Sequence, residues 1–201
     1  MWIDSEHALR ALYGQAGEAS LTKEVLALTP QYRALVEASP FCVLATAGPE
    51  GLDATPRGDP PGFIRVLDEK TLLIPDRRGN NRIDSLLNIV RDPRLALLIL
   101  VPGVAETLRV NGRGRITTDP ALLGPSTMDG KVPASGLVVT IESVYFQCAK
   151  ALVRSRLWDP AAQRNRAELP TPGQMLQGAR EGFDAEAYDK ALPARLAATL
   201  Y

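Results

Sequence analysis

Histidine is almost missing from this sequence, since the only one among 201 residues is His7. Catalytic triads of the Ser-His-Asp type, Cys-His dyads and histidine-ligated zinc sites all need an imidazole at their centre. The scarcity of histidine therefore excludes most hydrolase classes, and the sequence predicts no metal site. It also leaves no side chain with a resting pKa suited to acid catalysis, so the catalytic residue stays unassigned.

Cysteine is scarce as well, with Cys42 and Cys148 as the two cysteines of the chain. Two cysteines are too few for the disulfide framework of a small secreted protein. Their wide separation also excludes a zinc site of the CxxC type. We expect both to be buried thiols.

An excess of charge of either sign is absent, because 23 Lys and Arg residues balance 23 Asp and Glu residues. With only 5% aromatic residues, this balance argues against nucleic acid and against an anionic membrane as partners. The longest apolar run, Leu95–Val101, is far shorter than the about 20 residues of a membrane-spanning helix. The N-terminus also lacks the pattern of a signal peptide, so we expect a cytoplasmic protein with no membrane partner.

Two helical patterns precede a series of short strands. Residues 5–15 open with Ser5 as a cap, and a second helix starts on Pro30. Runs typical of strands follow, with turn signals about every ten residues. These runs are 41–47, 51–58, 62–68, 71–76, 94–103, 106–117 and 136–150. Residues 49–51 and 68–70 are typical of hairpin turns, which predicts antiparallel neighbours on either side.

Only one helical pattern, residues 81–92, interrupts this series of strands. Six or seven strands with so little helix favour a closed or nearly closed antiparallel barrel, because closure removes exposed edges. The predicted fold class is therefore mainly β, a β-barrel with flanking helices, in a single domain over 1–201. Its parts are N-terminal helices in 1–40, the barrel in 41–150, and a segment in 151–201 with a C-terminal helix that Pro193 interrupts.

The segment from Leu72 to Asp92 combines positive charge with amide side chains. Arg77, Arg78 and Arg82 surround Gly79, Asn80 and Asn81, between an apolar strand and a helical pattern. Asn81 is expected to cap the helix, which places Asp84 at the third helical position. Because a helix start offers free N–H groups and a partial positive charge, this junction is suited to bind a phosphate.

A solvated basic loop is the alternative interpretation of this segment. Charge-assisted hydrogen bonds to an anion contribute on the order of 1.5 to 3 kcal/mol each, against roughly 0 to 1 kcal/mol for an exposed ion pair. Only Asp76 and Asp84 are close in sequence to offset the three guanidinium groups. These magnitudes favour a bound anion.

Two further arginines lie on predicted strands. Arg57 stands at a strand end in TPRGDPPGF. In ETLRVNGRGRI, the alternation places Arg109 on a polar face, opposite Leu108 and Val110. Both arginines are candidates for the same anion site, and exposure of the polar face to water is the alternative for Arg109.

Four segments, in the same order, resemble one protein family. They are PRGDPPGF, LLIPDRRGNNRIDSLLNIVRDPRLALLILVPG, ETLRVNGRGRI and QCAKALVRSRLWDP. Together they are similar to the FMN-binding split barrels related to pyridoxamine 5'-phosphate oxidase, and most of all to a bacterial FMN-dependent branch with a PDR-GN-R-D signature. The resemblance covers residues 40–160 and implies a six-stranded antiparallel Greek-key split barrel. It also implies a homodimer with FMN in clefts between the subunits.

The resemblance assigns cofactor-binding residues. The phosphate of FMN is expected to contact Arg77, Arg78, Asn80, Asn81 and Arg82. Arg57, Pro75 and Asp76 are expected to border the flavin, with Arg109 as a further contact, while the second subunit brings Lys150, Arg154, Ser155 and Trp158 to the ring. A cation there stabilises the negative charge of the reduced ring, and Trp158 either stacks on the ring or lies in the core of the dimer interface.

The sequence departs from the family pattern at Gln147, where a histidine often precedes the cysteine. The arginine and histidine motifs with which the true oxidase holds its substrate are also missing, so oxidation of vitamin B6 is not expected. The resulting hypothesis is an FMN-dependent oxidoreductase whose small-molecule substrate and electron donor the sequence does not identify. The alternatives are a flavin carrier or redox sensor without enzymatic activity, and a binder of another phosphorylated cofactor such as deazaflavin.

Overall fold

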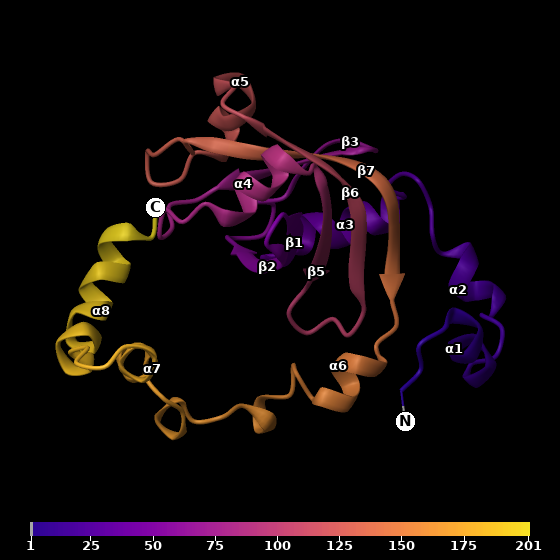
Figure 1. Ribbon diagram of the computed structural model, residues 1–201. Helices are drawn as coiled ribbons and strands as arrows, with labels where there is room; N and C mark the ends of the chain where they lie inside the picture. Colours follow the sequence, from indigo (N-terminus) through magenta and orange to yellow (C-terminus); the bar gives the residue numbers. More distant parts are fainter. Residues whose placement is uncertain (1) are drawn as a thin grey trace.

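Seven strands form one sheet in the computed structural model, which describes residues 2–201 (Figure 1). The strands are β1 (Phe41–Gly48), β2 (Gly51–Gly58), β3 (Arg65–Asp68), β4 (Thr71–Asp76), β5 (Arg94–Leu100), β6 (Thr107–Thr117) and β7 (Ser135–Gln147). Their order is β2-β1-β5-β6-β7-β4-β3, and every neighbouring pair is antiparallel. The predicted split-barrel class is confirmed. The strand count is seven and not six, because the short β3 also pairs with β4.

The predicted turns and N-terminal caps are present. Residues 49–50 connect β1 to β2, and residues 69–70 connect β3 to β4. The first helices are α1 (Glu6–Leu12), α2 (Glu18–Thr22) and α3 (Pro30–Ala38). Ser5 caps α1, since its hydroxyl accepts a hydrogen bond of 3.1 Å from the backbone N–H of Ala8.

The core lies on one face of the bent sheet, where alternate residues of β1, β5 and β6 are buried. In contrast, β4 is buried on both faces from Leu72 to Pro75. Helix α3 contacts β3 and β6, and α4 (Asp84–Arg91) lies against β1, β2 and β6. Since β4 cannot move without opening the core, the point where the chain leaves it is fixed.

The two cysteines have different environments. Cys42 is buried on β1, and this burial raises the pKa of its thiol to about 12. Cys148 is exposed, so the prediction that both thiols are buried is wrong for this one. The reason is its position just after the end of β7, where the chain has left the sheet.

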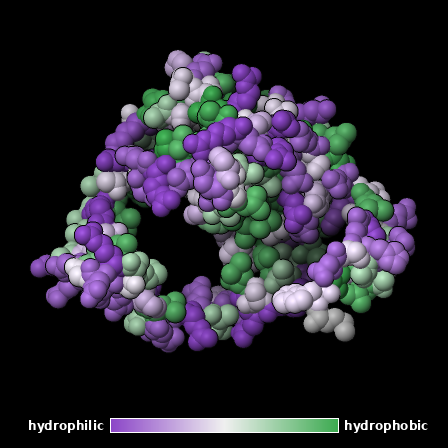
Figure 2. Space-filling model, in the orientation of Figure 1, coloured by the Kyte–Doolittle hydropathy of each residue, from purple (hydrophilic) through white to green (hydrophobic). Residues whose placement is uncertain are grey.

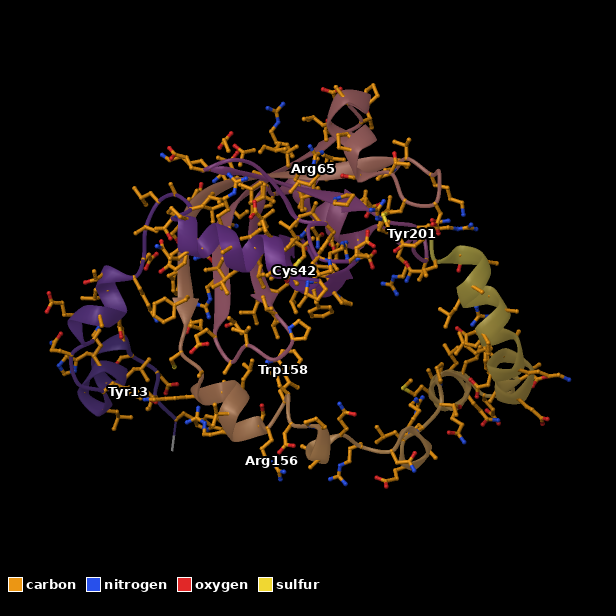
Figure 3. All side chains as sticks on the ribbon, turned by 180° about the vertical axis from the view of Figure 1, so that it is seen from behind. Tyr13, Cys42, Arg65, Arg156, Trp158 and Tyr201 are labelled. Atoms are coloured by element: carbon orange, nitrogen blue, oxygen red, sulfur yellow. The ribbon has the colours of Figure 1, made fainter. Side chains whose placement is uncertain are left out.

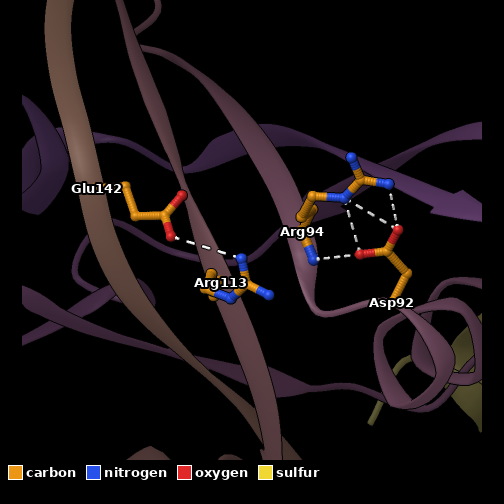
Figure 4. A network of polar contacts seen from close by, with 4 residues as sticks. All are labelled: Asp92, Arg94, Arg113 and Glu142. Carbon is orange, nitrogen blue, oxygen red and sulfur yellow. Dashed lines mark hydrogen bonds and ion pairs between the residues drawn. The ribbon is translucent and has the colours of Figure 1, made fainter.

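Exposed ion pairs mark the outer face of the sheet (Figure 4). Arg113 on β6 lies 3.8 Å from Glu142 on β7, and Arg94 lies 2.5 Å from Asp92. Hydrogen bonds from Arg94 lower the pKa of Asp92 to about 2. Such exposed pairs contribute little to stability, and they identify this face as one that water covers.

After β7 and the short α6 (Lys150–Ser155), residues 158–200 form an extended arm. The arm contains α7 (Pro172–Ala179) and α8 (Ala185–Thr199) and returns to the sheet near α4 (Figure 1). Figure 2 shows an opening between the arm and the sheet. Helix α8 continues through Pro193, so the predicted interruption is wrong; this helix has no buried residue, and water can satisfy the carbonyl that proline leaves free. No helix in residues 2–201 has the length and apolar character needed to cross a membrane.

Gly112 lies where the pairing of β6 with β7 shifts its register. A Cβ atom at this position would fall on the backbone carbonyl oxygen of Thr140. Because a backbone oxygen cannot rotate away, we expect Gly112→Ala to lower the free energy of unfolding by roughly 1 to 3 kcal/mol. Urea unfolding measures this loss, and Gly124→Ala is the control because nothing lies within 4 Å of its added atom. Equal stability of the two variants would contradict the prediction.

Candidate functional site

A cavity of about 900 Å³ opens where the ends of β2 and β4 meet the start of α4. Its lining includes Arg57, Pro75, Asp76, Arg77, Arg78, Asn80, Asn81 and Arg82, all of which were predicted to bind the cofactor. Strand β2 forms one edge of the sheet, and β4 lies next to the opposite edge. The cavity therefore lies at the split between the two ends of the sheet.

A buried ion pair joins the two sides of this split. Nε of Arg77, just after β4, donates to Oδ2 of Asp59, just after β2, at 2.5 Å. The exposed fractions are 17% for the Arg77 side chain and 2% for that of Asp59. Arg77 also donates to the carbonyl oxygen of Ser126 at 2.7 Å. Since its charge is already compensated by the buried Asp59, Arg77 organises the cavity wall more than it attracts a ligand.

The other arginines of the cavity differ in how far their charge is compensated. Arg82 pairs with Asp84 at 2.8 Å, and both side chains are exposed. Within residues 2–201, neither Arg57 nor Arg78 forms an ion pair. Arg57 donates only to neutral oxygens, those of the Thr55 hydroxyl and the Pro56 carbonyl. Arg57 and Arg78 are therefore the guanidinium groups most available to an anion.

The chain enters α4 through an unusual backbone conformation. Asn81 and Ile83 have φ angles of 61° and 52°, a region that β-branched residues rarely adopt. Ile83 precedes the first helical residue and gives no side-chain cap, so the prediction that Asn81 caps the helix, with Asp84 at its third position, is wrong. Instead, Oδ1 of Asn80 accepts a hydrogen bond of 3.1 Å from the Arg82 backbone N–H, which stabilises the turn before the helix.

The start of α4 faces the cavity. Asp84, Ser85 and Leu86 line it, and no side chain in the described chain caps their backbone N–H groups. The Ser85 hydroxyl donates to Asp53 on β2 at 2.9 Å and so ties the helix start to that strand. Free N–H groups at a helix start favour a bound anion, and Arg82 compensates the one carboxylate of this turn.

Asp76 is a half-buried carboxylate in the cavity lining. Burial raises its pKa above the ordinary value, while the nearby charge of Arg57 partly lowers it. Its side chain forms no ion pair within residues 2–201. Asp76 is therefore available to accept a hydrogen bond from an N–H group of a ligand.

Sequence reasoning missed three residues of this region, namely Asp59, Lys131 and Tyr201. The Tyr201 hydroxyl donates to Oδ1 of Asp59 at 2.8 Å, and Lys131 Nζ donates to the backbone oxygen of Tyr201 at 2.7 Å. Asp59 is part of PRGDPPGF, so a search for a carboxylate partner of the arginines could have found it. No pattern in the sequence indicates that Tyr201 returns to a residue 142 positions earlier.

Five predicted residues lie outside the cavity of their own chain. Arg109 is exposed on β6 and donates to the Tyr145 hydroxyl at 2.9 Å. Lys150, Arg154 and Ser155 are exposed on α6. Trp158 is half-buried, and its Nε1 donates to the carbonyl oxygen of Val104 at 2.8 Å. Figure 3 shows Trp158 well apart from Tyr201.

We expect Asp76→Asn to stabilise the free protein at pH 7. The pKa of Asp76 is raised by burial, so above that pKa the folded state carries an ionised carboxylate that the unfolded state solvates better. The gain should shrink as the pH falls towards the ordinary pKa of 3.8. Asp68→Asn is the control and should lower the stability at pH 7, because hydrogen bonding from the Lys70 backbone lowers the pKa of Asp68 and so favours its ionised form in the folded state. Thermal unfolding at several pH values would contradict us if both variants shifted stability in the same direction.

We expect glycine to be more stabilising than alanine at position 83. A residue with a Cβ atom pays roughly 1 to 2 kcal/mol in the left-handed region, where Ile83 lies. Val90, inside α4, provides the opposite case, because alanine is better than glycine by about 1 kcal/mol in a helix interior. Chemical unfolding of the four variants, Ile83→Gly, Ile83→Ala, Val90→Gly and Val90→Ala, tests this inversion. The same order at both positions would contradict it.

Solved structures show the fold to which this chain is similar. A variant of HupZ from group A Streptococcus matches with a TM-score of 0.50 and 16% identity, over 59% of this chain and 98% of that one. A Lactobacillus delbrueckii protein, designated a candidate pyridoxamine 5'-phosphate oxidase, matches with a TM-score of 0.47 and 22% identity, over 60% and 95% of the two chains. A relative of general stress protein 26 from Clostridium acetobutylicum has a TM-score of 0.45 and 15% identity, over 58% and 85%. At 16% identity, the match to HupZ shows a shared fold alone.

No curated protein matches the chain in sequence. The family model described as pyridoxamine 5'-phosphate oxidase matches residues 28–148, which is more than half of the chain. The match includes every strand of the sheet and the arginine-rich entry to α4. The chain therefore belongs to the pyridoxamine 5'-phosphate oxidase family.

Proposed function

We propose that the protein is an FMN-dependent oxidoreductase and that the cavity between β2, β4 and α4 binds FMN. The observation that carries this proposal is the convergence of Arg57, Arg78 and the uncapped start of α4 on one cavity of about 900 Å³. Pockets for small cofactors range over roughly 300 to 1,000 Å³, so the size fits. Membership of the pyridoxamine 5'-phosphate oxidase family supports the same conclusion.

The phosphate end of the ligand is assigned to the start of α4. The guanidinium groups of Arg57 and Arg78, which line the same cavity, and the free N–H groups of the first helical turn supply donors of positive character. The side chains of Asn81 and Arg82, at the same rim, add further donors. Asn80 adds its side-chain Nδ2 donors, because only its oxygen is bonded to the Arg82 backbone.

The flavin end of the ligand is assigned to the floor near the end of β4. Pro75 and Phe63 are buried residues that line the cavity and give it an apolar wall. Asp76 beside them accepts a hydrogen bond from a ring N–H group and so orients the ring. FMN supplies hydride or electron transfer when it is bound. The chain's own residues bind, orient and shield it.

The active form is proposed to be a homodimer in which α6 of one subunit serves the cavity of the other. Lys150, Arg154 and Ser155 are exposed on α6 and lie outside the cavity of their own chain. In the second subunit, Lys150 and Arg154 can add positive charge next to a reduced ring, and Ser155 can add a neutral hydrogen-bond donor. Trp158 shares this segment and is half-buried, in keeping with either a ring contact or a place in the interface.

Exposed apolar side chains on α6 and the arm support a homodimer of this kind. Neither α6 nor α8 has a buried residue. Large apolar side chains are instead exposed from α6 through the arm, by 63% at Val153, 51% at Leu157, 53% at Leu169, 58% at Met175 and 55% at Leu196. Exposed apolar surface of this extent favours coverage by another chain. Figure 2 shows an opening between the arm and the sheet, so this side of the arm is not covered by the sheet of its own chain.

We expect the double variant Arg57→Ala with Arg78→Ala to weaken FMN binding by about 2 to 5 kcal/mol, because each lost charge-assisted hydrogen bond costs roughly 1.5 to 3 kcal/mol. Titration of the apoprotein with FMN, followed by flavin fluorescence, measures this change. The double variant Arg113→Ala with Arg115→Ala removes the same charge from exposed positions of β6 and is the matched control. Unchanged affinity in the first variant, or equal losses in both, would remove the cavity as the FMN site.

The same preparation tests whether the protein is an enzyme. An oxidoreductase should sustain turnover of FMN reduced by a nicotinamide donor in the presence of an electron acceptor. Stoichiometric binding of FMN without any turnover would instead identify a flavin carrier or redox sensor. Failure of the wild-type protein to bind FMN at all would contradict the proposed cofactor.

A further inference from the structure

Tyr201 lies in the wall of the cavity and contacts three separate elements there. Its hydroxyl donates to Asp59 after β2 at 2.8 Å, and its ring lies 5.5 Å from the guanidinium carbon of Arg77 after β4. Its backbone oxygen accepts a hydrogen bond of 2.7 Å from Lys131, which precedes β7. One residue thus touches the positions at which several strands enter or leave the split in the sheet.

These contacts act on the ion pair that spans the split. Asp59 uses one carboxylate oxygen for Arg77 and the other for the Tyr201 hydroxyl. Arg77 is bonded to Asp59 and to Ser126, and the Tyr201 ring covers its guanidinium group within cation–π distance. Tyr201 therefore contacts both members of the ion pair and, together with Ser126, restricts the position of the Arg77 side chain.

Tyr201 is also the place where the far end of the arm reaches the sheet. Within residues 2–201, no hydrogen bond or ion pair connects residues 159–200 to the strands. Trp158 fixes the near end of the arm through its bond to Val104, and Tyr201 fixes the far end. Figure 3 shows these two anchors at separate places on the molecule.

We propose that Tyr201 is a positioning residue of the cavity, and that its docking on Arg77 and Asp59 is positively coupled to the binding of FMN in this cavity. This inference rests on the proposed function. The cavity retains about 900 Å³ with Tyr201 in its wall, so the docked side chain leaves space for a ligand. A ligand that needs the ordered wall binds more tightly when Tyr201 is docked, and by linkage its binding makes undocking of the arm rarer.

Limited digestion with trypsin tests the docking without any ligand. The arm offers exposed cleavage sites at Arg164, Arg166, Arg180 and Arg195. We expect cleavage in the arm to be several-fold faster in Tyr201→Ala than in the wild-type protein. Tyr201→Phe, which keeps the ring over Arg77 but loses the bond to Asp59, should be intermediate. Leu200→Ala is the control, because Leu200 is 63% exposed and does not line the cavity.

The coupling is tested by adding FMN to the same four proteins. FMN should slow cleavage of the arm in the wild-type and Leu200→Ala proteins but not in Tyr201→Ala. The dissociation constant for FMN should rise about 5- to 30-fold in Tyr201→Ala, the range expected for a coupling of 1 to 2 kcal/mol. It should rise less in Tyr201→Phe and stay unchanged in Leu200→Ala. Thermal unfolding confirms that each variant is folded before titration.

Three outcomes would overturn the inference. Equal cleavage rates in the wild-type and Tyr201→Ala proteins would show that Tyr201 does not anchor the arm. Faster cleavage of Tyr201→Ala with an unchanged dissociation constant for FMN would refute the coupling while leaving FMN binding intact. Absence of FMN binding in the wild-type protein would overturn the proposed function and the coupling together, and the digestion without ligand would still decide whether Tyr201 anchors the arm.

Discussion

The ion pair between Arg77 and Asp59 closes the split of the sheet, and the site depends on it. The two residues follow β4 and β2, strands that lie towards opposite ends of the sheet and are not neighbours. Removing one partner of such a buried pair leaves an uncompensated charge, which typically costs 3 to 5 kcal/mol. The pair therefore fixes the distance between the two walls of the cavity and allows the rest of its lining to be arranged for a ligand.

Features that cost stability collect around this pair. Ile83 adopts a left-handed backbone conformation, Asp76 carries a carboxylate with a pKa raised by burial, and Arg57 and Arg78 have no ion-pair partner within residues 2–201. On the outer face of the sheet, in contrast, charged side chains compensate each other in ion pairs such as those of Figure 4. Backbone strain and uncompensated charges that gather in one cavity are typical of a protein whose cavity binds a ligand.

The sequence predicted the strands well, because hydrophobic alternation and turn residues are local signals. It also predicted that Arg57, Arg78 and the asparagines after β4 come together, since they stand at strand ends that a barrel brings to one place. It did not separate Arg77 from the other arginines. Arg77 became part of a buried pair only because Asp59 arrives from a distant strand, and no local pattern encodes that meeting.

The start of α4 is a second feature that the sequence did not predict correctly. Asn81 has the right side chain to cap a helix, but the helix begins two residues later than that role requires. The turn is instead closed by Asn80, and Ile83 accepts a strained conformation at the helix start. Tertiary packing overrides the preference of Asn81 for the capping position. Helix α4 must pack on β1 and β6 while its first turn stays next to β2 through the bond from Ser85 to Asp53.

The division of the arginines explains why one sequence cluster can serve two purposes. A guanidinium group that binds a ligand needs free donors, whereas one that fixes a wall needs partners in the protein that hold it in place. Arg78 meets the first condition, because it is exposed and unpaired in the described chain, and Arg77 meets the second. The adjacent positions differ because the Arg77 side chain reaches Asp59, whereas Arg78 is exposed in the cavity lining. Geometry at the end of β4, and not composition, therefore decides which arginine organises the cavity and which is available to an anion.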